Sequence, residues 1–435
     1  MKKTLSVVDA TALIVGIVVG VGIFKTPSIV AAYTGSSGIF IGVWALGGLI
    51  SLMGASCYAE LASTHPHPGG EYHYLGLALG RHVAFLFAWA RMMVIQTGSI
   101  AMLAFVLGDY LSQVVPLGTH SSSLYGSLSV IVLTAINMIG IREGKCVQNL
   151  LTGVKVAGLL LIVLTGLLFS DPQPTGLSSV SSSAPAFGLS MIFVLLTYGG
   201  WNEAAYISAE LRDLRRNMVR SLLWGIILIT IIYILINWVY VRVLGITFMG
   251  KSDAVAYDLM NRIVGPYGAK LAGILIAISA LGAMNATVIT GARTNYALGE
   301  TSAGFRYMGR WNERTGSPVY ALGVQGIIAL LLIGLGTVTM KGFVTMVEYT
   351  APVFWLFFLL TTLSLLVLRV KEPTIVRPFR VPLYPFTPIF FCVVCMFMLV
   401  SSILYTGIGA LVGIAVLVAG SLFLLVSTHK DAREE

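Results

Sequence analysis

Apolar residues dominate almost the whole chain and are interrupted at intervals by short polar segments. Many of the apolar runs reach the roughly twenty residues that a helix needs to cross a bilayer. We therefore predict an all-α membrane protein with twelve transmembrane helices. The expected spans are 5–33, 39–62, 83–111, 125–141, 149–169, 187–210, 218–241, 270–298, 319–338, 343–369, 386–406 and 408–428.

Two of these spans are interrupted near their middles by small residues. Gly20, Val21 and Gly22 interrupt the first, and adjacent glycines at 199 and 200 interrupt the sixth. The bilayer core offers the backbone no hydrogen-bonding partner, so unwound backbone at that depth must line a cavity or be buried in protein. Interruptions of this kind in two halves of a chain are typical of a transporter's substrate site.

Composition agrees with this pattern. Hydrophobic residues make up 57% of the 435 residues, charged residues make up 10%, and the mean hydropathy is +0.89. Soluble domains do not have such a composition. No polar stretch could form a second domain, so we expect residues 1–435 to be a single transmembrane domain.

The distribution of positive charge predicts the orientation in the membrane. Most of the 27 lysines and arginines fall in alternate loops, for example in segments 212–220, 306–314 and 369–380. Cytoplasmic loops are enriched in these residues, so we expect both termini in the cytoplasm of a multi-pass protein of a prokaryotic cytoplasmic membrane. The net charge of +9 follows from this topology, and no basic stripe with interleaved aromatics indicates nucleic-acid binding. The first apolar run is also too long for a cleavable signal peptide.

Cysteine and histidine positions do not indicate a metal or another cofactor. Cys392 and Cys395 form a CxxC within an apolar run, without the βαβ setting of a redox motif or the second pair of a zinc site. His65, His67 and His73 lie in a loop rich in proline and glycine, so no helix presents them together. We therefore expect no cofactor and no bound metal.

The first interruption has the chemistry to bind an amino acid. Glycine lets the backbone open at 20–22, and the freed amides, with the positive end of a half-helix beginning near Pro27, would hold a carboxylate. Carbonyls at the end of the preceding half-helix would hold an ammonium. Gly16 and Gly20 also have the spacing of a helix-packing contact, and this stretch alone leaves both readings open.

The sixth span adds Asn202 and Glu203 directly after its glycines, and polar groups at that depth are usually functional. At this point the chain resembles a known family, the amino acid, polyamine and organocation superfamily, in the branch related to the L-amino-acid transporters. The likeness covers nearly the whole chain. Its motifs are GVGIF at 20–24, PGGEYHY at 68–74, YGGWN at 198–202, RN at 216–217 and RPFRVPLYP at 377–385.

The resemblance implies a fold of two inverted repeats, 1–170 and 187–370, with helices 1 and 6 broken and two additional helices in 386–428. It also implies that the substrate carboxylate binds the amides of Val21 and Gly22, next to Ile23. The carbonyls of Val18, Leu196 and Gly199, next to Tyr198, would bind the ammonium. Side-chain selectivity would then depend on the matching pocket positions, which are Ser99, Met102, Leu196, Asn202, Met284 and Asn285.

The chain departs from the family pattern in two places. Relatives often carry an aromatic gate where this chain has Leu196, which leaves Tyr198 or Trp201 as the nearest rings. Leu214 replaces a proline that is usual after helix 6, and we expect no functional consequence from it. How the pocket closes therefore stays open.

Outside the two interruptions, Lys155 is the residue with the most specific functional hypothesis. The uncharged run after it, 156–169, is too short to span a bilayer, so Lys155 must lie inside the membrane. In proton-linked and exchanging members of the superfamily, a lysine in helix 5 stands where sodium-coupled relatives bind a cation. The resemblance implies that Lys155 bridges helix 1 near Gly16 to helix 8 near Thr290 and couples protonation to closure. The alternative is that its side chain snorkels to the membrane surface.

Four further charges lie within the expected spans. Arg91 and Glu60 are expected to snorkel. Glu203 and Glu348 lie deeper, where they would be proton acceptors, partners of a cationic substrate, or members of structural ion pairs.

The function that these features favour is secondary transport of neutral L-amino acids by alternating access, with proton symport or with exchange of one amino acid for another. A cationic amino acid or polyamine carrier is the alternative, motivated by Glu203 and Glu348. A channel would need a repeated filter or a charged ring. An intramembrane protease is suggested by the GxSG motif at 35–38, but no later span holds a histidine to act as base, so we expect no enzyme. Whether a partner subunit binds stays open.

Overall fold

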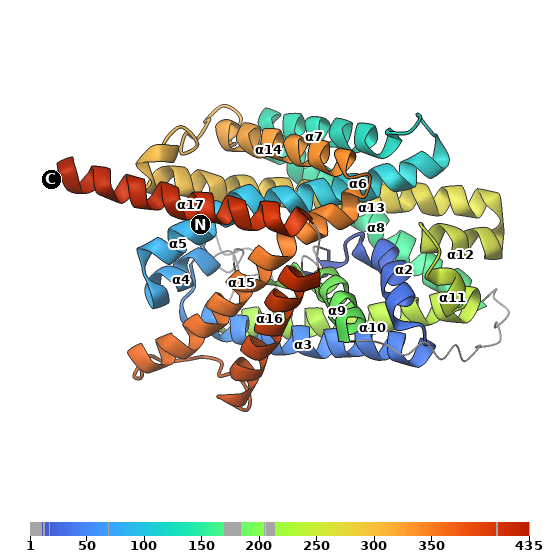
Figure 1. Ribbon diagram of the computed structural model, residues 1–435, viewed down its shortest axis with the longest axis horizontal. Helices are drawn as coiled ribbons and strands as arrows, with labels where there is room; N and C mark the ends of the chain where they lie inside the picture. Colours follow the sequence, from blue (N-terminus) through green and yellow to red (C-terminus); the bar gives the residue numbers. More distant parts are fainter. Residues whose placement is uncertain are drawn as a thin grey trace.

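The computed structural model describes residues 11, 14–16, 18–67, 69–168, 184–203, 205, 214–405 and 408–434. Within these residues the fold is almost entirely helical (Figure 1), which confirms an all-helical membrane protein. Eight helices of the described part are long and apolar enough to cross a membrane, and two shorter apolar helices, Gly153–Leu168 and Gly409–Leu424, accompany them.

The helices follow one another along the chain with few residues between them. Their bounds are α2 Gly22–Thr34, α3 Ser37–Thr64, α4 Glu71–Leu79, α5 Arg81–Ala90, η1 Arg91–Ile95, α6 Gln96–Val114, α7 Ser121–Ile139, α8 Ile141–Leu168, α9 Ala184–Tyr198, α10 Leu214–Leu244, α11 Ile246–Met249, α12 Val255–Val264, α13 Pro266–Thr301, η3 Ala303–Phe305, α14 Val319–Val338, α15 Gly342–Lys371, α16 Phe386–Tyr405 and α17 Ile408–Glu434.

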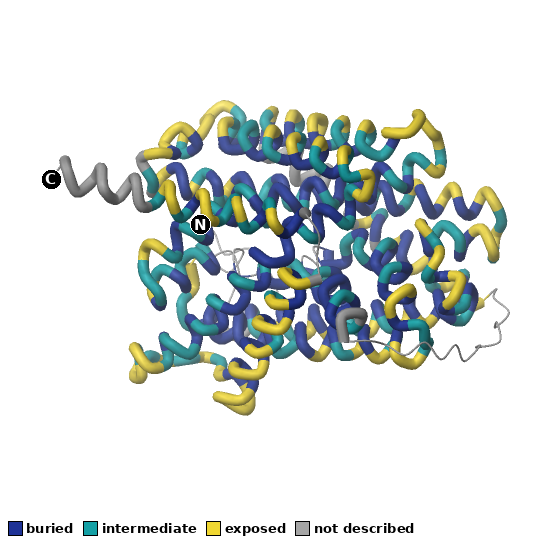
Figure 2. The backbone as a smooth tube through the Cα atoms, in the orientation of Figure 1, coloured by how far each residue is buried: buried dark blue, intermediate teal, exposed yellow. Residues whose placement is uncertain are grey.

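Long helices surround a pair of short ones. In Figure 1, α6, α7, α13 and α14 lie along one side, α3 and α10 along the other, and α2 and α9 between them. The inner helices α2 and α9 pack against each other, α13 packs against α6 and α8, and α10 packs against α3. Figure 2 shows buried residues gathered between the helices and exposed residues on their outer faces, as lipid-facing apolar helices require.

The third expected span differs from a simple helix. It runs as α5, η1 and α6, and η1 at Arg91–Ile95 is a π-helical turn. A π turn inserts an extra residue per turn and redirects the side chains around it, and such turns are frequent at functional sites. Hydrophobicity predicts the span but not this distortion within it.

The loops also contain structure that the hydrophobic pattern did not predict. α4 lies between the second and third expected spans, and α11 and α12 lie between the seventh and eighth. α8 begins at Ile141, earlier than the expected 149, because the chain turns at Gly140 and continues as a helix at once.

The backbone loses its helical conformation at both glycine-rich interruptions. Residues 19–21 form a bend directly before α2, and residues 199–200 form a turn directly after α9, followed by a short 3-10 stretch at 201–203. α2 begins at Gly22, earlier than the start near Pro27 that the sequence suggested. These two breaks face one another because α2 packs against α9.

Candidate functional site

A cavity lies where the two breaks meet. Its volume is about 160 Å³, roughly ten times the ~15 Å³ that one water molecule needs, so it has room for a ligand of several heavy atoms. Its lining residues are Val18, Gly20, Val21, Gly22, Thr26, Ile95, Gln96, Ser99, Met102, Leu103, Phe193, Leu196, Thr197, Gly199, Gly200, Asn202, Glu203, Ala283, Ala286, Thr287, Thr290, Phe343, Val347, Thr350 and Phe354.

The first break supplies hydrogen-bond donors. The amides of Val21, Gly22 and Ile23 have no hydrogen-bond partner among the described residues, whereas the amide of Phe24 already donates to the Val21 carbonyl at 3.0 Å. No side chain caps the start of α2. Free amides at a helix start, together with its partial positive charge, suit an anionic group such as a carboxylate.

The second break supplies hydrogen-bond acceptors. The Leu196 carbonyl accepts the Gly199 amide at 3.0 Å, which leaves one of its two lone pairs, and no donor is recorded for the Gly199 carbonyl among the described residues. The Val18 carbonyl is different, because it accepts the Gly20 amide at 2.6 Å and the Tyr233 hydroxyl at 2.9 Å. Its acceptor capacity is filled, so this carbonyl is not available to an ammonium group.

Tyr233 joins the two breaks, although no pattern in the sequence predicts this role. The hydroxyl of this α10 side chain lies 2.9 Å from the Val18 carbonyl and 3.2 Å from the Thr197 carbonyl. Its ring packs against Trp44 and Tyr198 and is fully buried. A buried hydroxyl between two interrupted helices satisfies carbonyls at the helix ends that lack a following helical turn.

Two glycines are needed at the breaks for different reasons. A Cβ built on Gly22 would lie 2.9 Å from Oγ1 and 3.0 Å from Cγ2 of Thr197, so the close approach of α2 to α9 requires glycine there. Thr197 also donates a 2.9 Å hydrogen bond to Thr26 across the same contact. Gly200 has a φ of 106°, a backbone conformation that only glycine adopts without strain.

Most of the expected pocket residues line the cavity. Those that do are Val18, Val21, Gly22, Ser99, Met102, Leu196, Gly199, Asn202, Glu203 and Thr290. Those expected at the site that do not line it are Ile23, Tyr198, Trp201, Met284, Asn285, Gly16, Lys155 and Glu348.

The two positions expected on α13 do not line the cavity. Met284 and Asn285 are buried in the core, and the Asn285 amide oxygen accepts a 2.7 Å hydrogen bond from Asn137 of α7. The cavity is lined by the face of α13 that carries Ala283, Ala286, Thr287 and Thr290, whose spacing of three and four residues marks one side of a helix. The neighbouring positions 284 and 285 point elsewhere for the same reason.

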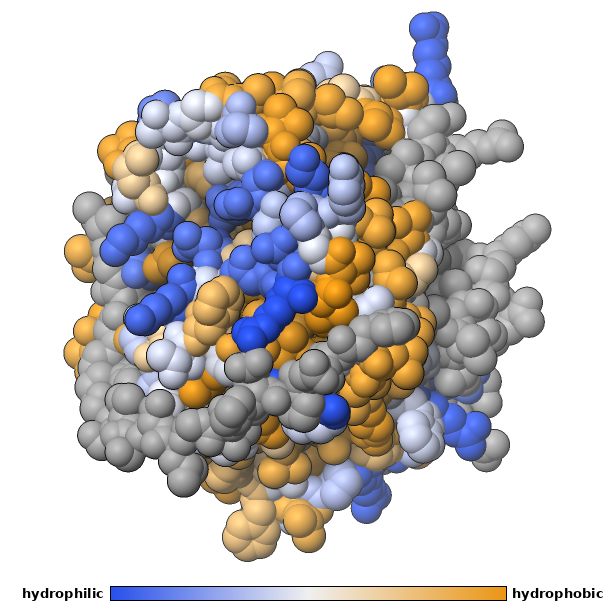
Figure 3. Space-filling model, turned by 90° about the vertical axis from the view of Figure 1, so that its right-hand side faces the viewer, coloured by the Kyte–Doolittle hydropathy of each residue, from blue (hydrophilic) through white to orange (hydrophobic). Residues whose placement is uncertain are grey.

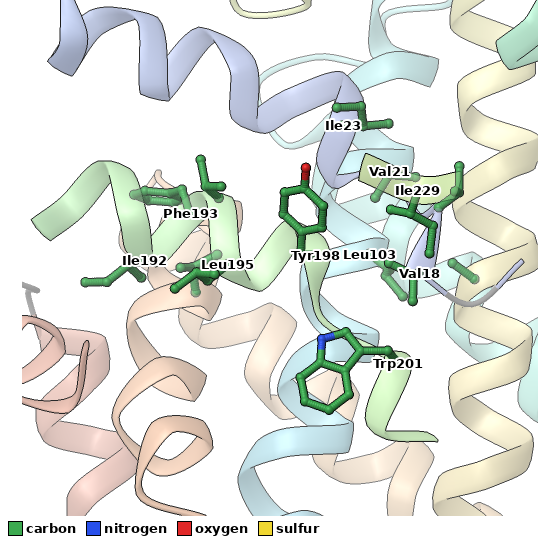
Figure 4. Close-up of a cluster of buried hydrophobic side chains, with 14 of the residues drawn as sticks. Val18, Val21, Ile23, Leu103, Ile192, Phe193, Leu195, Tyr198, Trp201 and Ile229 are labelled. Carbon is green, nitrogen blue, oxygen red and sulfur yellow. The ribbon is translucent and has the colours of Figure 1, made fainter. Parts of the chain in front are cut away.

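The aromatic rings expected near the site, those of Tyr198 and Trp201, do not line the cavity either. The Tyr198 hydroxyl donates to the Trp44 carbonyl at 3.0 Å, and Trp201 packs on Tyr58 and Phe358. Figure 4 shows these two side chains on either side of the turn after α9, pointing different ways. The rings that line the cavity are instead Phe193, Phe343 and Phe354.

Lys155 lies in α8 and is buried, with an exposed fraction of 2%. Its ammonium donates a 2.8 Å hydrogen bond to the Gly16 carbonyl, just before the first break. The described residues give no hydrogen bond between Lys155 and Thr290, whose hydroxyl lies 3.4 Å from the Thr287 carbonyl. The structure therefore links the Lys155 ammonium to the first helix, and the side chain does not snorkel.

The expectation that Arg91 and Glu60 snorkel was wrong. Both are buried, with exposed fractions of 1% and 2%. Arg91 donates to both carboxylate oxygens of Glu203, at 2.9 and 2.8 Å, and Glu60 accepts a 2.7 Å hydrogen bond from Arg369. A buried charge is stable only when it is paired, and each of these two side chains forms an ion pair with a residue distant in the sequence.

Glu203 and Glu348 have different surroundings. The Glu203 carboxylate lines the cavity and is bound by Arg91 and, at 3.3 Å, by the Gln96 amide. Glu348 lies on α15 between cavity-lining Val347 and Thr350, but its Cβ faces α17, where a Cβ built on Gly409 would lie 2.9 Å away. Glu348 therefore does not contribute to the cavity wall.

A second, more open cavity of about 460 Å³ lies toward one end of the bundle. Lys25 and Asp109 line it and form a 3.2 Å ion pair, and Phe343 lines both this cavity and the central one. Figure 3 looks onto this end of the molecule and shows hydrophilic residues gathered in the middle of the face. We call the 460 Å³ cavity the vestibule.

Two interrupted helices that meet at a cavity within a bundle of membrane-spanning helices are the architecture of a secondary transporter. A family model described as amino acid permease matches residues 5–426. The chain therefore belongs to the amino acid permease family. It is an amino acid transporter and not an enzyme, which confirms the resemblance seen in its motifs.

Individual relatives agree with this assignment. The b(0,+)-type amino acid transporter 1 of Mus musculus is 30% identical over 413 residues, which cover 93% of this chain and 83% of that protein. The Asc-type amino acid transporter 1 of Mus musculus is 28% identical over 434 residues, with coverage of 97% and 80%. The serine/threonine exchanger SteT of Bacillus subtilis (strain 168) is 27% identical over 424 residues, with 95% of each chain covered.

Proposed function

We propose that this transporter carries neutral L-amino acids by alternating access, and that it exchanges one amino acid for another. The observation that carries the proposal is the cavity between the two breaks. Its free amides at Val21 and Gly22 would hold the substrate carboxylate, and its free acceptors at Leu196 and Gly199 would hold the ammonium.

The neutral preference follows from the rest of the cavity wall. Apart from Glu203, its lining side chains are apolar or uncharged, and Glu203 is already paired with Arg91. A substrate with a cationic side chain would find no free carboxylate there. This pairing argues against the cationic amino acid or polyamine alternative, and the position of Glu348 argues against it as well.

Exchange is supported by the name of the relative SteT, a serine/threonine exchanger. Proton symport remains the competing mode of the same carrier, and Lys155 is the group proposed to link it to the first break. With its ammonium on the Gly16 carbonyl, Lys155 holds the segment before that break. Loss of the contact would free this segment to move.

The proposed topology places both termini in the cytoplasm, because the loops that hold most lysines and arginines then lie inside. In this orientation the vestibule faces outward. The proposed repeats are 1–170 and 187–370, since the two breaks then occupy corresponding positions, and 386–428 adds two further helices.

Competition for uptake into proteoliposomes tests the proposal. Radiolabelled alanine is offered with unlabelled neutral, cationic or acidic amino acids, to vesicles that are either empty or preloaded with alanine, with and without a pH gradient. We expect competition by neutral amino acids and faster uptake into preloaded vesicles. Competition by arginine or a polyamine alone would contradict the proposed substrate class, and equal uptake into empty vesicles driven by the pH gradient would contradict exchange.

The Lys155→Ala variant tests the coupling role in the same vesicles. We expect it to bind alanine but to lose most of the exchange rate, because the segment before the first break has lost its contact. Thr165→Ala in the same helix is a matched control, since its hydroxyl bonds only within α8 and to Met260. Wild-type exchange in Lys155→Ala would contradict the role.

A further inference from the structure

Among the described residues, one carboxylate lines the cavity, and a neighbouring arginine side chain already forms an ion pair with it. Glu203 follows the second break and lines the cavity, while Arg91 does not line it and lies behind the carboxylate. The Arg91 guanidinium donates to both oxygens of Glu203, at 2.9 and 2.8 Å. The Arg91 guanidinium therefore occupies the position at Glu203 where the charged end of a cationic substrate side chain would otherwise bind.

The position of Arg91 is built into the fold. It is the first residue of the π-helical turn η1, and turns of this kind are frequent at functional sites. Its exposed fraction is 1%, and its Nε donates to the Thr294 hydroxyl of α13 at 3.2 Å. Because Arg91 is anchored on α13 as well as on Glu203, it is not displaced by simple rotation of its side chain.

A second carboxylate belongs to the same cluster. Glu71 of α4 lies 3.7 Å from the Arg91 guanidinium and accepts hydrogen bonds from the Tyr58 hydroxyl at 2.5 Å and from the Asn202 amide at 3.4 Å. Glu71 is buried and does not line the cavity. The cluster of Glu71, Arg91 and Glu203 thus holds two carboxylates and one guanidinium, and one of the carboxylates faces the substrate.

We propose that Arg91 is a specificity-determining residue, which excludes cationic amino acids by occupying Glu203. Without Arg91, Glu203 becomes a binding site for the ammonium or guanidinium of a lysine or arginine substrate. This inference rests on the proposed function, since it explains the preference for neutral substrates. A carboxylate released from its internal partner inside the helix bundle attracts a cation more strongly than one in bulk water, because the effective dielectric constant is lower there.

The variant that tests this must not leave two unpaired carboxylates side by side. Arg91→Met alone does so, and it is at risk of misfolding. Arg91→Met/Glu71→Gln removes one charge of each sign and keeps the charge of the cluster at its wild-type value. Adding Glu203→Gln gives a triple variant of almost the same shape without the cavity carboxylate. Arg369→Met, which breaks the ion pair with Glu60 away from the cavity, is the control for loss of a buried pair.

Two measurements are made on each protein. One is the ability of arginine and lysine to compete with alanine uptake in proteoliposomes, and the other is the rise in melting temperature of the purified protein in detergent when arginine is added. The second measurement also applies to a variant that folds but does not transport. If the double variant is not recovered, Arg91→Gln/Glu71→Gln takes its place.

We expect arginine to compete at least about tenfold better in the double variant than in the wild type, as one charged hydrogen bond would give. The triple variant and Arg369→Met should show no such gain in arginine competition and no arginine-dependent rise in melting temperature. Strong arginine competition in the wild type, or a double variant that carries alanine and binds no arginine, would overturn the inference. If no neutral amino acid competes in any protein, the proposed function fails instead.

Discussion

The two breaks around the cavity look alike in sequence and differ in structure. At the first break, the amides of Val21 and Gly22 have no partner among the described residues, and the Val18 carbonyl is filled by Gly20 and Tyr233. At the second break, the Gly199 carbonyl has no donor within the described part of the chain, while the Gly199 amide and the Gly200 carbonyl are engaged. The amides at 21–22 and the carbonyls at 196 and 199 together complement an amino acid with one anionic and one cationic group.

The glycines of the two breaks also differ in what they permit. Gly22 is needed because Thr197 approaches it closely, whereas Gly200 is needed for its own backbone conformation. A steric requirement can be relieved by changing the neighbour, and a backbone requirement cannot. This difference makes the comparison testable.

The largest effect is expected from Gly200→Ala. A side chain at a φ of 106° costs about 1–3 kcal/mol, and the surrounding turn would have to change to relieve the strain. We expect alanine exchange to fall by about tenfold or more, with a lower melting temperature. Uptake assays and thermal unfolding in detergent measure both. Wild-type exchange in this variant would mean that the turn does not hold the acceptors.

Gly22→Ala should have a smaller effect that a second change partly reverses. Overpacking of this kind costs about 1–3 kcal/mol, and truncating the neighbour in Gly22→Ala/Thr197→Ala removes the two nearest atoms. With Thr197→Ala alone as the reference, a double-mutant cycle of melting temperatures measures the coupling. The double variant should be more stable than the sum of the single changes implies. Simple additivity would argue against the close contact, and an equal rescue of Gly200→Ala by a neighbour would remove the distinction between the breaks.

Tyr233→Phe should affect both breaks together. It removes a hydroxyl that lies within 3.2 Å of carbonyls from each of them, and a hydrogen bond of this kind contributes about 0.5–1.5 kcal/mol. We expect KM for alanine to change by up to about tenfold while the protein still folds. Tyr240→Phe, in the same helix and equally buried, is the control. An unchanged KM in Tyr233→Phe would contradict its place between the breaks.

The smallest effect concerns a change that leaves both breaks untouched. Burial first, and then the charges of the neighbouring His67 and His65, lower the pKa of His73 in α4 to about 4. The unfolded chain binds the proton first, so His73 destabilises the protein progressively as the pH falls from about 6.5 to about 4.

His73→Gln should therefore weaken the acid dependence of the melting temperature in this pH range and leave KM for alanine unchanged. Melting curves between pH 7 and pH 4 measure the first, and uptake at neutral pH measures the second. A steeper acid dependence in the variant would have the wrong sign. A changed KM would show that α4 reaches the site.

The sequence predicted the membrane class, the positions of both breaks and part of the cavity lining. These features are local, because apolar length identifies a spanning helix and glycine identifies where it unwinds. The family motifs then placed residues such as Ser99, Met102 and Asn202 around the site. All three line the cavity.

The errors involve features that single-helix patterns do not contain. α13 is apolar on all sides, so its sequence does not tell which face meets the cavity, and Met284 and Asn285 were chosen in place of Ala283 and Thr287. Arg91 was expected to snorkel because its partner Glu203 lies 112 residues away and the π turn that redirects it leaves no clear mark in the sequence. Tyr233 was missed for the same reason, as its contacts span 215 residues.

The central claim is that the two breaks hold the two charged groups of one amino acid. Competition by close analogues of alanine tests it without any mutation. Alaninamide keeps the ammonium and lacks the carboxylate, and propionate keeps the carboxylate and lacks the ammonium. The account predicts that unlabelled alanine blocks uptake of radiolabelled alanine and that neither analogue does so at the same concentration. Competition by either analogue as strong as that by alanine would contradict it.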